Sequence, residues 1–361
     1  MSGRILVAGF ATRHVAASAC RAGYGVIAVD HFCDLDLVRV ADTCHRFETL
    51  EELAAIATSA ARENDVVGFL AGSGAETLAL PVPLLGTQPA VAARFLDKRE
   101  TQTFFETLGV RAPHPKPVGT YPAMAKPIHG SGGWRNAVVG SDDELAAWRG
   151  LFPDQPYLLQ EVIEGVPASV SCIADGRRAV AVATNRQLLR GGTGMGYGFA
   201  GSVTPCDHPL AEEMAAIAET IAGASGCVGS LGIDFVLPRE GEPVAIEVNP
   251  RFQGTLETVE AATGVNLVRL HLDACDGRLP DLRPEPQQYA ARRILFADRD
   301  LVVGTDLSLL GTMVADIPPP GTTIPAGSAV VSVRATGRDE VTALALLDKH
   351  ITAVRTYMER W

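Results

Sequence analysis

The chain has 361 residues, of which 47% are hydrophobic and 20% are charged, a balance typical of a folded protein of two or three domains. Its formal net charge is -11, so it has no basic field that would recruit nucleic acid or an anionic membrane. We therefore expect small-molecule chemistry, with no nucleic acid and no membrane as partner.

The first 92 residues alternate strand-like and helix-like segments. A strand in residues 4–8 leads through a turn at Gly9 into a helix and a second strand that ends at Asp30, and residues 48–65 have helical periodicity. This alternation predicts a parallel, Rossmann-like sheet. The turn supplies only one of the three glycines of a dinucleotide site, so we interpret it as a tight βα turn, with a role in holding substrate left open.

The middle of the chain changes character. Residues 90–109 predict one helix closed by Gly109, and residues 111–122 form a proline-rich connector. Short strands follow, with a helix whose start is marked by Ser141 and Glu144 as a capping box. From Pro280 onward, another break precedes strand-like runs and a final helix.

Residues 232–251 predict a β-hairpin with a short polar turn. If the turn centres between Glu240 and Gly241, Asp234 lies opposite Glu247. Alternation then predicts that three polar residues, Asp234, Glu247 and Asn249, share one face. The apolar residues expected on the opposite, buried face are Ile233, Phe235, Ile246 and Val248.

Two facing carboxylates repel each other unless a cation lies between them. Oxygen ligands of this kind suit Mg²⁺, which binds one or two carboxylates together with substrate phosphates. Arg251, two residues beyond Asn249, can follow the same face and offer a guanidinium to a phosphate. The alternative is a pair of solvated carboxylates on an exposed hairpin.

Two further stretches are candidates for nucleotide contacts. Lys126 ends a strand and precedes a glycine loop whose backbone N–H groups could cover phosphates, although a flexible hairpin tip would look the same. The polar run from Gln160 to Glu164 could serve a purine edge or be a solvated turn. Lys98 alone would be read as a surface lysine.

The seven cysteines are scattered and never spaced C-x-x-C, which predicts free thiols in a reducing cytosol instead of a disulfide framework or a zinc site. The N-terminus runs directly into a strand-like segment, and no uncharged stretch approaches the ~18 residues of a membrane span. We therefore expect a cytoplasmic protein.

The order and spacing of these elements resemble the ATP-grasp superfamily, which includes D-alanine:D-alanine ligase and biotin carboxylase. The resemblance covers about residues 90–280, and the layout is similar to a branch of carboligases related to biotin carboxylase. It implies an α/β (α+β) fold: a Rossmann-like pre-ATP-grasp domain at residues 1–92, then a two-lobed ATP-grasp domain with antiparallel sheets at residues 93–284, whose lid is about residues 112–165. Residues 285–361 would complete this core or form a small third domain.

The resemblance also implies site roles. Lys98 and Lys126 would contact the phosphates of ATP, and Arg251 would stabilise the transferring phosphoryl group. Mg²⁺, which Mn²⁺ could replace, would be held by Asp234, Glu247 and Asn249. The residues of the phosphate lid would be Gly130, Ser131, Gly132 and Gly133, and those of the adenine hinge Gln160, Glu161, Val162 and Ile163. Many relatives hold the ribose with a Glu in a G-x-E pattern; this chain has Pro167 and Ala168 there, so Glu164 would take that role instead.

The implied chemistry is attack of a carboxylate on ATP to form an acyl phosphate, followed by an amine, with release of ADP and phosphate. The expected enzyme is an acid-amine ligase of amino-acid or cofactor biosynthesis, such as a glutamate-adding ligase of pterin or furan one-carbon cofactors. A carboxylase or other phosphoryl-transfer enzyme acting on an oxyanion, and a non-catalytic nucleotide-binding regulator, stay as alternatives. The identities of the carboxylate and amine and the oligomeric state are open, a homodimer included.

Several more residues are candidates around the substrate. His129 could be an auxiliary acid or base or a simple hydrogen-bond donor. The segment 188–201 has six glycines from Gly191 onward and is a candidate lid, with Asn185, Arg186 and Gln187 near the substrate, or an ordinary flexible loop. The remaining candidates, which could line the substrate cleft or lie in ordinary loops, are Asp30, Asp34, Asp36, Ser73 and Glu76.

Overall fold

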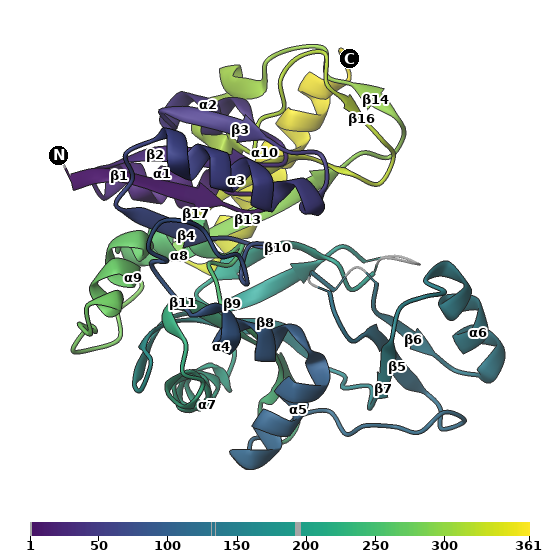
Figure 1. Cartoon of the computed structure of the whole chain (residues 1–361). Coiled ribbons are helices and arrows are strands. Elements are labelled where there is room, and N and C mark those ends of the chain that lie inside the picture. Colours follow the sequence, from purple (N-terminus) through teal and green to yellow (C-terminus); the bar gives the residue numbers. More distant parts are fainter. Residues whose placement is uncertain (1, 131, 134, 192–195) are drawn as a thin grey trace.

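The computed structural model describes residues 2–130, 132–133, 135–191 and 196–361 (Figure 1). Its first unit is a four-stranded parallel sheet in the order β3-β2-β1-β4, as the alternating pattern predicts. The strands are β1 (Ser2–Ala8), β2 (Tyr24–Asp30), β3 (Thr43–Arg46) and β4 (Gly68–Ala71), and the helices are α1 (Arg13–Arg21), α2 (Leu35–Val40) and α3 (Leu50–Glu63).

Two helices connect this unit to the rest of the chain, where the sequence predicted one. They are α4 (Pro89–Leu96) and α5 (Lys98–Thr107), and the break lies at Asp97. The Asp97 carboxylate accepts the backbone N–H of Arg99 at 2.8 Å, so it caps α5 and ends the preceding helix. Lys98 is thereby placed in the first turn of a helix and not in the middle of one.

A small antiparallel sheet in the order β6-β5-β7 follows, together with one helix. These elements are β5 (Ala123–Pro127), β6 (Ala137–Val139), α6 (Asp142–Leu151) and β7 (Tyr157–Gln160). The Ser141 hydroxyl accepts the Glu144 N–H at 3.2 Å, so the predicted helix start is confirmed. Figure 1 shows this lobe set apart from the large sheet.

The large sheet has eight antiparallel strands in the order β12-β11-β8-β9-β10-β13-β17-β15. In chain order they are β8 (Val166–Asp175), β9 (Ala179–Leu189), β10 (Phe199–Thr204), β11 (Val228–Leu237), β12 (Val244–Asn249), β13 (Tyr289–Phe296), β15 (Val314–Ala315) and β17 (Ala329–Gly337). Three strands after residue 285, β13, β15 and β17, therefore share one sheet with β8 to β12.

The remaining elements cover this sheet and join it to the first unit. They are α7 (Ala211–Ala224), α8 (Leu256–Thr263), α9 (Leu267–Cys275), the two-stranded pair β14 (Leu301–Val302) and β16 (Thr323–Ile324), the 3-10 helix η1 (Leu307–Met313) and α10 (Glu340–Met358). A continuous apolar core links α1 to α8 and α9. The Asn266 side chain also donates to the Ser18 carbonyl at 2.9 Å, across the same junction.

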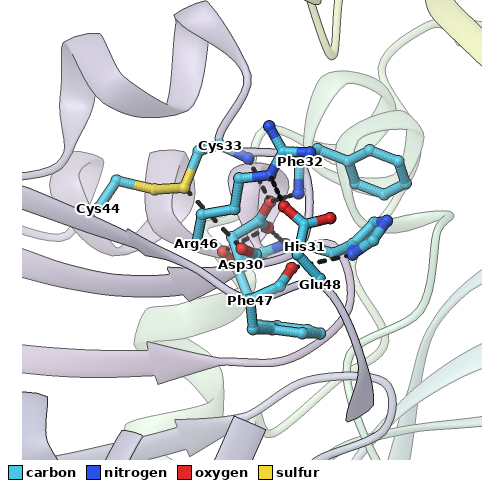
Figure 2. The surroundings of a disulfide bond; sticks show 9 residues. Asp30, His31, Phe32, Cys33, Cys44, Arg46, Phe47 and Glu48 are labelled. Atoms are coloured by element: carbon cyan, nitrogen blue, oxygen red, sulfur yellow. Dashed lines mark hydrogen bonds and ion pairs between the residues drawn. A yellow bond between two sulfur atoms is a disulfide. The ribbon is translucent and has the colours of Figure 1, made fainter. Parts of the chain in front are cut away.

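One expectation about cysteines is wrong. Cys33 and Cys44 form a disulfide, with their Cα atoms 6.3 Å apart (Figure 2). Because β3 pairs with β2 and places Cys44 beside Ala28, the turn that follows β2 brings Cys33 back next to it. The free thiols are Cys20, Cys172, Cys206, Cys227 and Cys275. No helix in the described part of the chain is long and apolar enough to cross a membrane.

Candidate functional site

The hairpin of β11 and β12 has the register that the sequence predicts. Asp234 pairs with Glu247 and Gly232 pairs with Asn249. A bulge next to Asp234 shifts the pairing, so that Phe235 lies opposite Ala245. The expectation that Ile246 faces the core is therefore wrong: Ala245 is fully buried in its place, and Ile246 is half-buried.

The two carboxylates share a network of amide donors. The Asn249 amide nitrogen donates to Asp234 Oδ2 at 3.1 Å and to Glu247 Oε1 at 3.3 Å, and the Gln187 amide donates to Asp234 Oδ1 at 2.9 Å. Burial, and next the charge of Glu247, raise the pKa of Asp234 well above its usual range. The pair therefore favours a bound proton or cation.

The donor set fits a hard divalent cation that takes further ligands from phosphate or water. The Asn249 side-chain amide would have to rotate before its oxygen could bind a cation between the carboxylates. At present Oδ1 accepts a hydrogen bond from Arg251 Nη2 at 3.0 Å. Among the described residues no group of three or more His, Cys, Asp or Glu could hold a metal ion by itself.

Two lysines approach the same carboxylate. Lys98 Nζ lies 3.9 Å from Glu247 Oε2 and donates to the Gly130 carbonyl at 2.7 Å. Lys126, near the end of β5, is 6% exposed, and its burial lowers its pKa to about 8, opposed by Glu247 and reinforced by Lys98. The structure thus gathers both lysines, the start of the glycine loop and the hairpin.

Arg251 is held by the first unit of the chain. Its Nε atom lies 2.6 Å from Glu76 Oε1, and both side chains are nearly buried, with 11% and 6% exposed. Glu76 also accepts the Gly74 N–H at 2.7 Å. The sequence left open whether Glu76 lines the substrate cleft or lies in an ordinary loop. The structure places it beside Arg251, the arginine that is predicted to contact phosphate.

The glycine loop, residues 130–133, is hydrogen-bonded to the start of β10. Gly130, Gly132 and Gly133 have φ angles of 146°, 74° and 71°, which side chains resist, and the Gly132 carbonyl accepts the Phe199 N–H at 2.9 Å. Ser131 lies outside the described residues. The loop joins antiparallel strands β5 and β6, in the arrangement expected for a phosphate cover.

The segment from Gln160 to Glu164 joins β7 to β8. Gln160 is buried and donates to the Gln102 side chain at 3.0 Å. The Glu161 N–H donates to the His114 carbonyl at 2.8 Å, and its carboxylate accepts the His114 N–H at 3.3 Å. Val162 and Ile163 are half-buried and Glu164 is exposed, so these residues lie in an irregular, partly open stretch.

Other sequence candidates have different surroundings. Gln187 reaches Asp234, whereas Asn185 is buried and accepts the Thr204 hydroxyl at 2.6 Å, and Arg186 pairs with Glu340. His129 Nδ1 lies 3.1 Å from the Leu96 carbonyl. That Asn185 and Arg186 lie near the substrate stays a prediction. Residues 192–195 of the candidate lid lie outside the described part of the chain.

A buried ionic network that joins α1 to α8 and β13 was not identified from the sequence. Arg13 of α1 lies 2.8 Å from Asp316 Oδ1 and 2.5 Å from Glu257 Oε1. Arg292 of β13 also pairs with Asp316, at 2.7 Å, and donates to the Gly254 carbonyl at 2.9 Å. These residues are up to 303 positions apart along the chain, so no local spacing could have revealed the network.

Asp34 lies beside this network and is distinct from its members. Its side chain is buried, with 9% exposed. Burial, followed by the charges of neighbouring carboxylates, raises its pKa to about 8. Asp36, in contrast, accepts the backbone N–H groups of Asp316 and Ile317 at 3.0 and 2.9 Å. Asp30 accepts the Thr12 hydroxyl at 2.8 Å and the N–H groups of Phe32 and Cys33 in its own turn.

Comparison with known proteins agrees with this geometry. Residues 95–255 match the family model of the ATP-grasp domain, which confirms the resemblance seen in the sequence. A curated relative, the carbamoyl phosphate synthase large chain of Rubrobacter xylanophilus, is 26% identical over 260 residues, which cover 63% of this chain and 24% of that protein. The chain thus spans about a quarter of the length of this relative.

Solved structures show the same fold over nearly the whole chain. A biotin carboxylase–β-γ-ATP complex from Campylobacter jejuni superposes with a TM-score of 0.77 at 16% identity, covering 95% of this chain and 89% of that one. An L-amino acid ligase from Bacillus licheniformis gives 0.71 at 16% identity, covering 98% and 97%.

Proposed function

We propose that this chain, which contains an ATP-grasp domain, is an ATP- and Mg²⁺-dependent ligase that joins a carboxylate to an amine and releases ADP and phosphate. The observation that carries the proposal is the convergence of Lys98, Lys126 and Arg251 on the facing pair Asp234 and Glu247. Cations on one side of paired carboxylates make a place where a metal and several phosphate oxygens can lie together.

The proposed reaction divides into two steps. A carboxylate oxygen of the first substrate attacks the γ-phosphorus, the bond to the β–γ bridging oxygen breaks, and ADP leaves. The amine nitrogen of the second substrate then attacks the acyl carbon, phosphate leaves with the C–O bonding electrons, and the nitrogen loses a proton. Both steps need positioning and charge neutralisation more than a dedicated protein nucleophile.

The residues would divide the work as follows. Lys98 and Lys126 would hold phosphate oxygens, and Arg251, kept in place by Glu76, would neutralise the charge on the transferring group. Mg²⁺, or Mn²⁺ in its place, would be held by Asp234, Glu247 and Asn249 and would neutralise phosphate charge. The set proposed to cover the phosphates is Gly130, Ser131, Gly132 and Gly133, and the set proposed to hold the nucleoside is Gln160, Glu161, Val162, Ile163 and Glu164.

A second candidate is carboxylation or another phosphoryl transfer to an oxyanion. It is favoured by the match to a carbamoyl phosphate synthase and by the fold shared with biotin carboxylase. The L-amino acid ligase shares the fold at the same identity, so the comparisons do not separate the two candidates. A regulator that binds nucleotide without turnover would not need both lysines, the paired carboxylates and Arg251 together.

The test is product analysis with Mg·ATP against a matrix of carboxylates, amines and bicarbonate, with L-glutamate present on both sides. ADP and phosphate released only with one carboxylate–amine pair, together with the amide, establish the ligase and name its substrates. Turnover with bicarbonate alone favours the second candidate. AMP and pyrophosphate, or tight ATP binding with no turnover, would reject the acyl-phosphate route.

Matched variants separate the site from the scaffold. Glu247→Ala should abolish Mg²⁺-dependent turnover, whereas Glu240→Ala, an exposed position at the turn of the same hairpin, should leave it unchanged. Lys126→Ala should weaken ATP binding, whereas Lys349→Ala, an exposed lysine in α10, should not. The argument for Glu247 fails if both Glu variants lose Mg²⁺-dependent turnover. The argument for Lys126 fails if both Lys variants bind ATP more weakly.

A further inference from the structure

We propose that Phe10, His31 and Phe32, here called the ring cluster, bind a planar aromatic or heteroaromatic ring carried by one of the two substrates. The inference rests on the proposed ligase function and names a substrate class for it. It predicts that the enzyme prefers a ring-bearing substrate to an aliphatic one of the same shape.

The three rings are packed against one another in a defined geometry. The rings of Phe10 and His31 are stacked, with centroids 4.8 Å apart and planes 12° from parallel. Phe32 lies edge-on to both, at 5.2 Å from Phe10 and 4.8 Å from His31. Stacked and edge-on arrangements are those that aromatic groups favour, so a further ring can extend the same packing.

The two phenylalanines of the ring cluster are exposed, although their rings are large and apolar, and His31 is half-buried. Phe10 is 41% exposed and Phe32 is 36% exposed, and the two rings touch. Single exposed apolar side chains are ordinary, but adjoining aromatic ones leave a patch whose burial against a ligand would be favourable.

The backbone places the ring cluster where parallel sheets bind ligands. The chain runs from β1 through β2 to β3 on one side of β1 and then returns to β4 on the other, so the order of strands reverses between β1 and β4. Ligands of open parallel sheets bind outside the carboxyl ends of the strands at this reversal. There Gly9 approaches Gly72 so closely that a Cβ on Gly9 would lie 2.9 Å from the Gly72 Cα.

Hydrogen bonds to the backbone of the ring cluster hold it at this position. The Phe10 N–H donates to the Ser73 carbonyl at 2.7 Å, and the His31 N–H donates to the Phe10 carbonyl at 3.3 Å. Asp30 Oδ1 accepts the N–H groups of Phe32 and Cys33, at 2.7 and 2.8 Å. Figure 2 shows the disulfide on one side of Asp30 and the rings of His31 and Phe32 on the other. The segment that carries these rings is therefore preorganised.

The same loop leads to the reaction centre. Ser73, which binds the Phe10 backbone, is followed by Gly74, whose N–H is held by Glu76, and Glu76 pairs with Arg251 at 2.6 Å. The ring cluster and the arginine proposed to contact the transferring phosphoryl group are thus connected through a few residues of one loop. A substrate could place its ring on the cluster while its carboxylate or amine reaches toward Arg251.

The experiment compares substrates that differ in the ring alone. As amines we would use benzylamine and cyclohexylmethylamine, and as acids phenylacetate and cyclohexylacetate, with a pyridine analogue of each ring compound. We expect the parent enzyme to favour the aromatic member in kcat/KM. Phe10→Leu and Phe32→Leu, which keep apolar bulk but remove the ring, should each reduce that preference about 2- to 10-fold. Leu282→Ala, an exposed apolar residue after α9, should leave it unchanged.

Binding is measured independently by saturation-transfer NMR with the same compounds in the absence of turnover. Ring binding that is lost in Phe10→Leu, without amide formation from these compounds or from any carboxylate–amine pair of the matrix above, keeps the ring cluster and rejects the ligase. Amide formation with the same kcat/KM for the aromatic and the cyclohexyl compound keeps the ligase and overturns the ring cluster. The proposal is also overturned if no ring compound binds, or if the two Phe variants merely dissociate a dimer on size-exclusion chromatography.

Discussion

Lys126 should take up a proton when nucleotide binds. Its side chain is 6% exposed, and burial lowers its pKa to about 8, with Lys98 acting in the same direction and Glu247 against it. Phosphate oxygens beside the lysine would stabilise its charged form and raise this pKa again. Nucleotide binding near pH 8 should therefore draw a proton from solution.

The size of the effect follows from the pKa. With a pKa of about 8, roughly half of the unliganded molecules have a neutral Lys126 at pH 8, and about a tenth at pH 7. Binding should thus take up about 0.5 proton at pH 8 and about 0.1 at pH 7. Titration calorimetry with a non-hydrolysable ATP analogue and no metal, in two buffers of different ionisation enthalpy, measures this number directly, because a metal would displace a proton held by Asp234 and Glu247.

A conservative variant provides the control. Lys126→Arg keeps a cation that stays protonated at these pH values, so its binding should show almost no proton uptake at pH 8. Lys349→Arg, on the exposed face of α10, should behave like the parent. Equal uptake by the parent and Lys126→Arg, or none by the parent at pH 8, would refute the link between this lysine and the phosphates.

Three other perturbations test the surroundings of the site. Asp234→Asn removes one of two facing carboxylates, so in the absence of metal the variant should melt at a higher temperature than the parent. Mg²⁺ should raise the melting temperature of the parent but not that of the variant. A variant that Mg²⁺ still stabilises would speak against this metal site. Glu76→Ala leaves Arg251 buried and unpaired, so urea denaturation should show a loss of about 3 kcal/mol, and an unchanged midpoint would contradict a tight pair. The pKa of Asp34 is raised to about 8, so between about pH 4 and pH 8 the folded chain keeps a proton that the unfolded chain releases, and stability falls as pH rises. Asp34→Asn should therefore be more stable than the parent near pH 8.5, with the gap closing toward pH 5 in thermal melts; a gap independent of pH would show that the carboxyl does not titrate in this window.

The elements that the sequence predicted well depend on neighbours in the chain. Alternation and a short turn are enough to place Asp234 opposite Glu247, because the register of a hairpin follows from its turn. The same holds for the parallel first unit and for the glycine loop between β5 and β6. Two predictions from the local sequence were wrong because of single structural features. The cap at Asp97 divides the predicted helix in two, and a bulge in β11–β12 removes Ile246 from the core face.

What decided the rest was the docking of distant segments. The pairing of Glu76 with Arg251 joins residues 175 positions apart, and Arg13 and Asp316 are separated by 303. Such contacts require α1 to pack on α8 and α9, and no spacing in the sequence records that packing. The ring cluster likewise exists because strands β1 and β2 end side by side. By itself the sequence determined the local chemistry of the hairpin and the loop, because adjacent residues set strand register and turns. The tertiary structure alone decided which residues of the first unit meet them, since buried charges acquire partners only when the units come together.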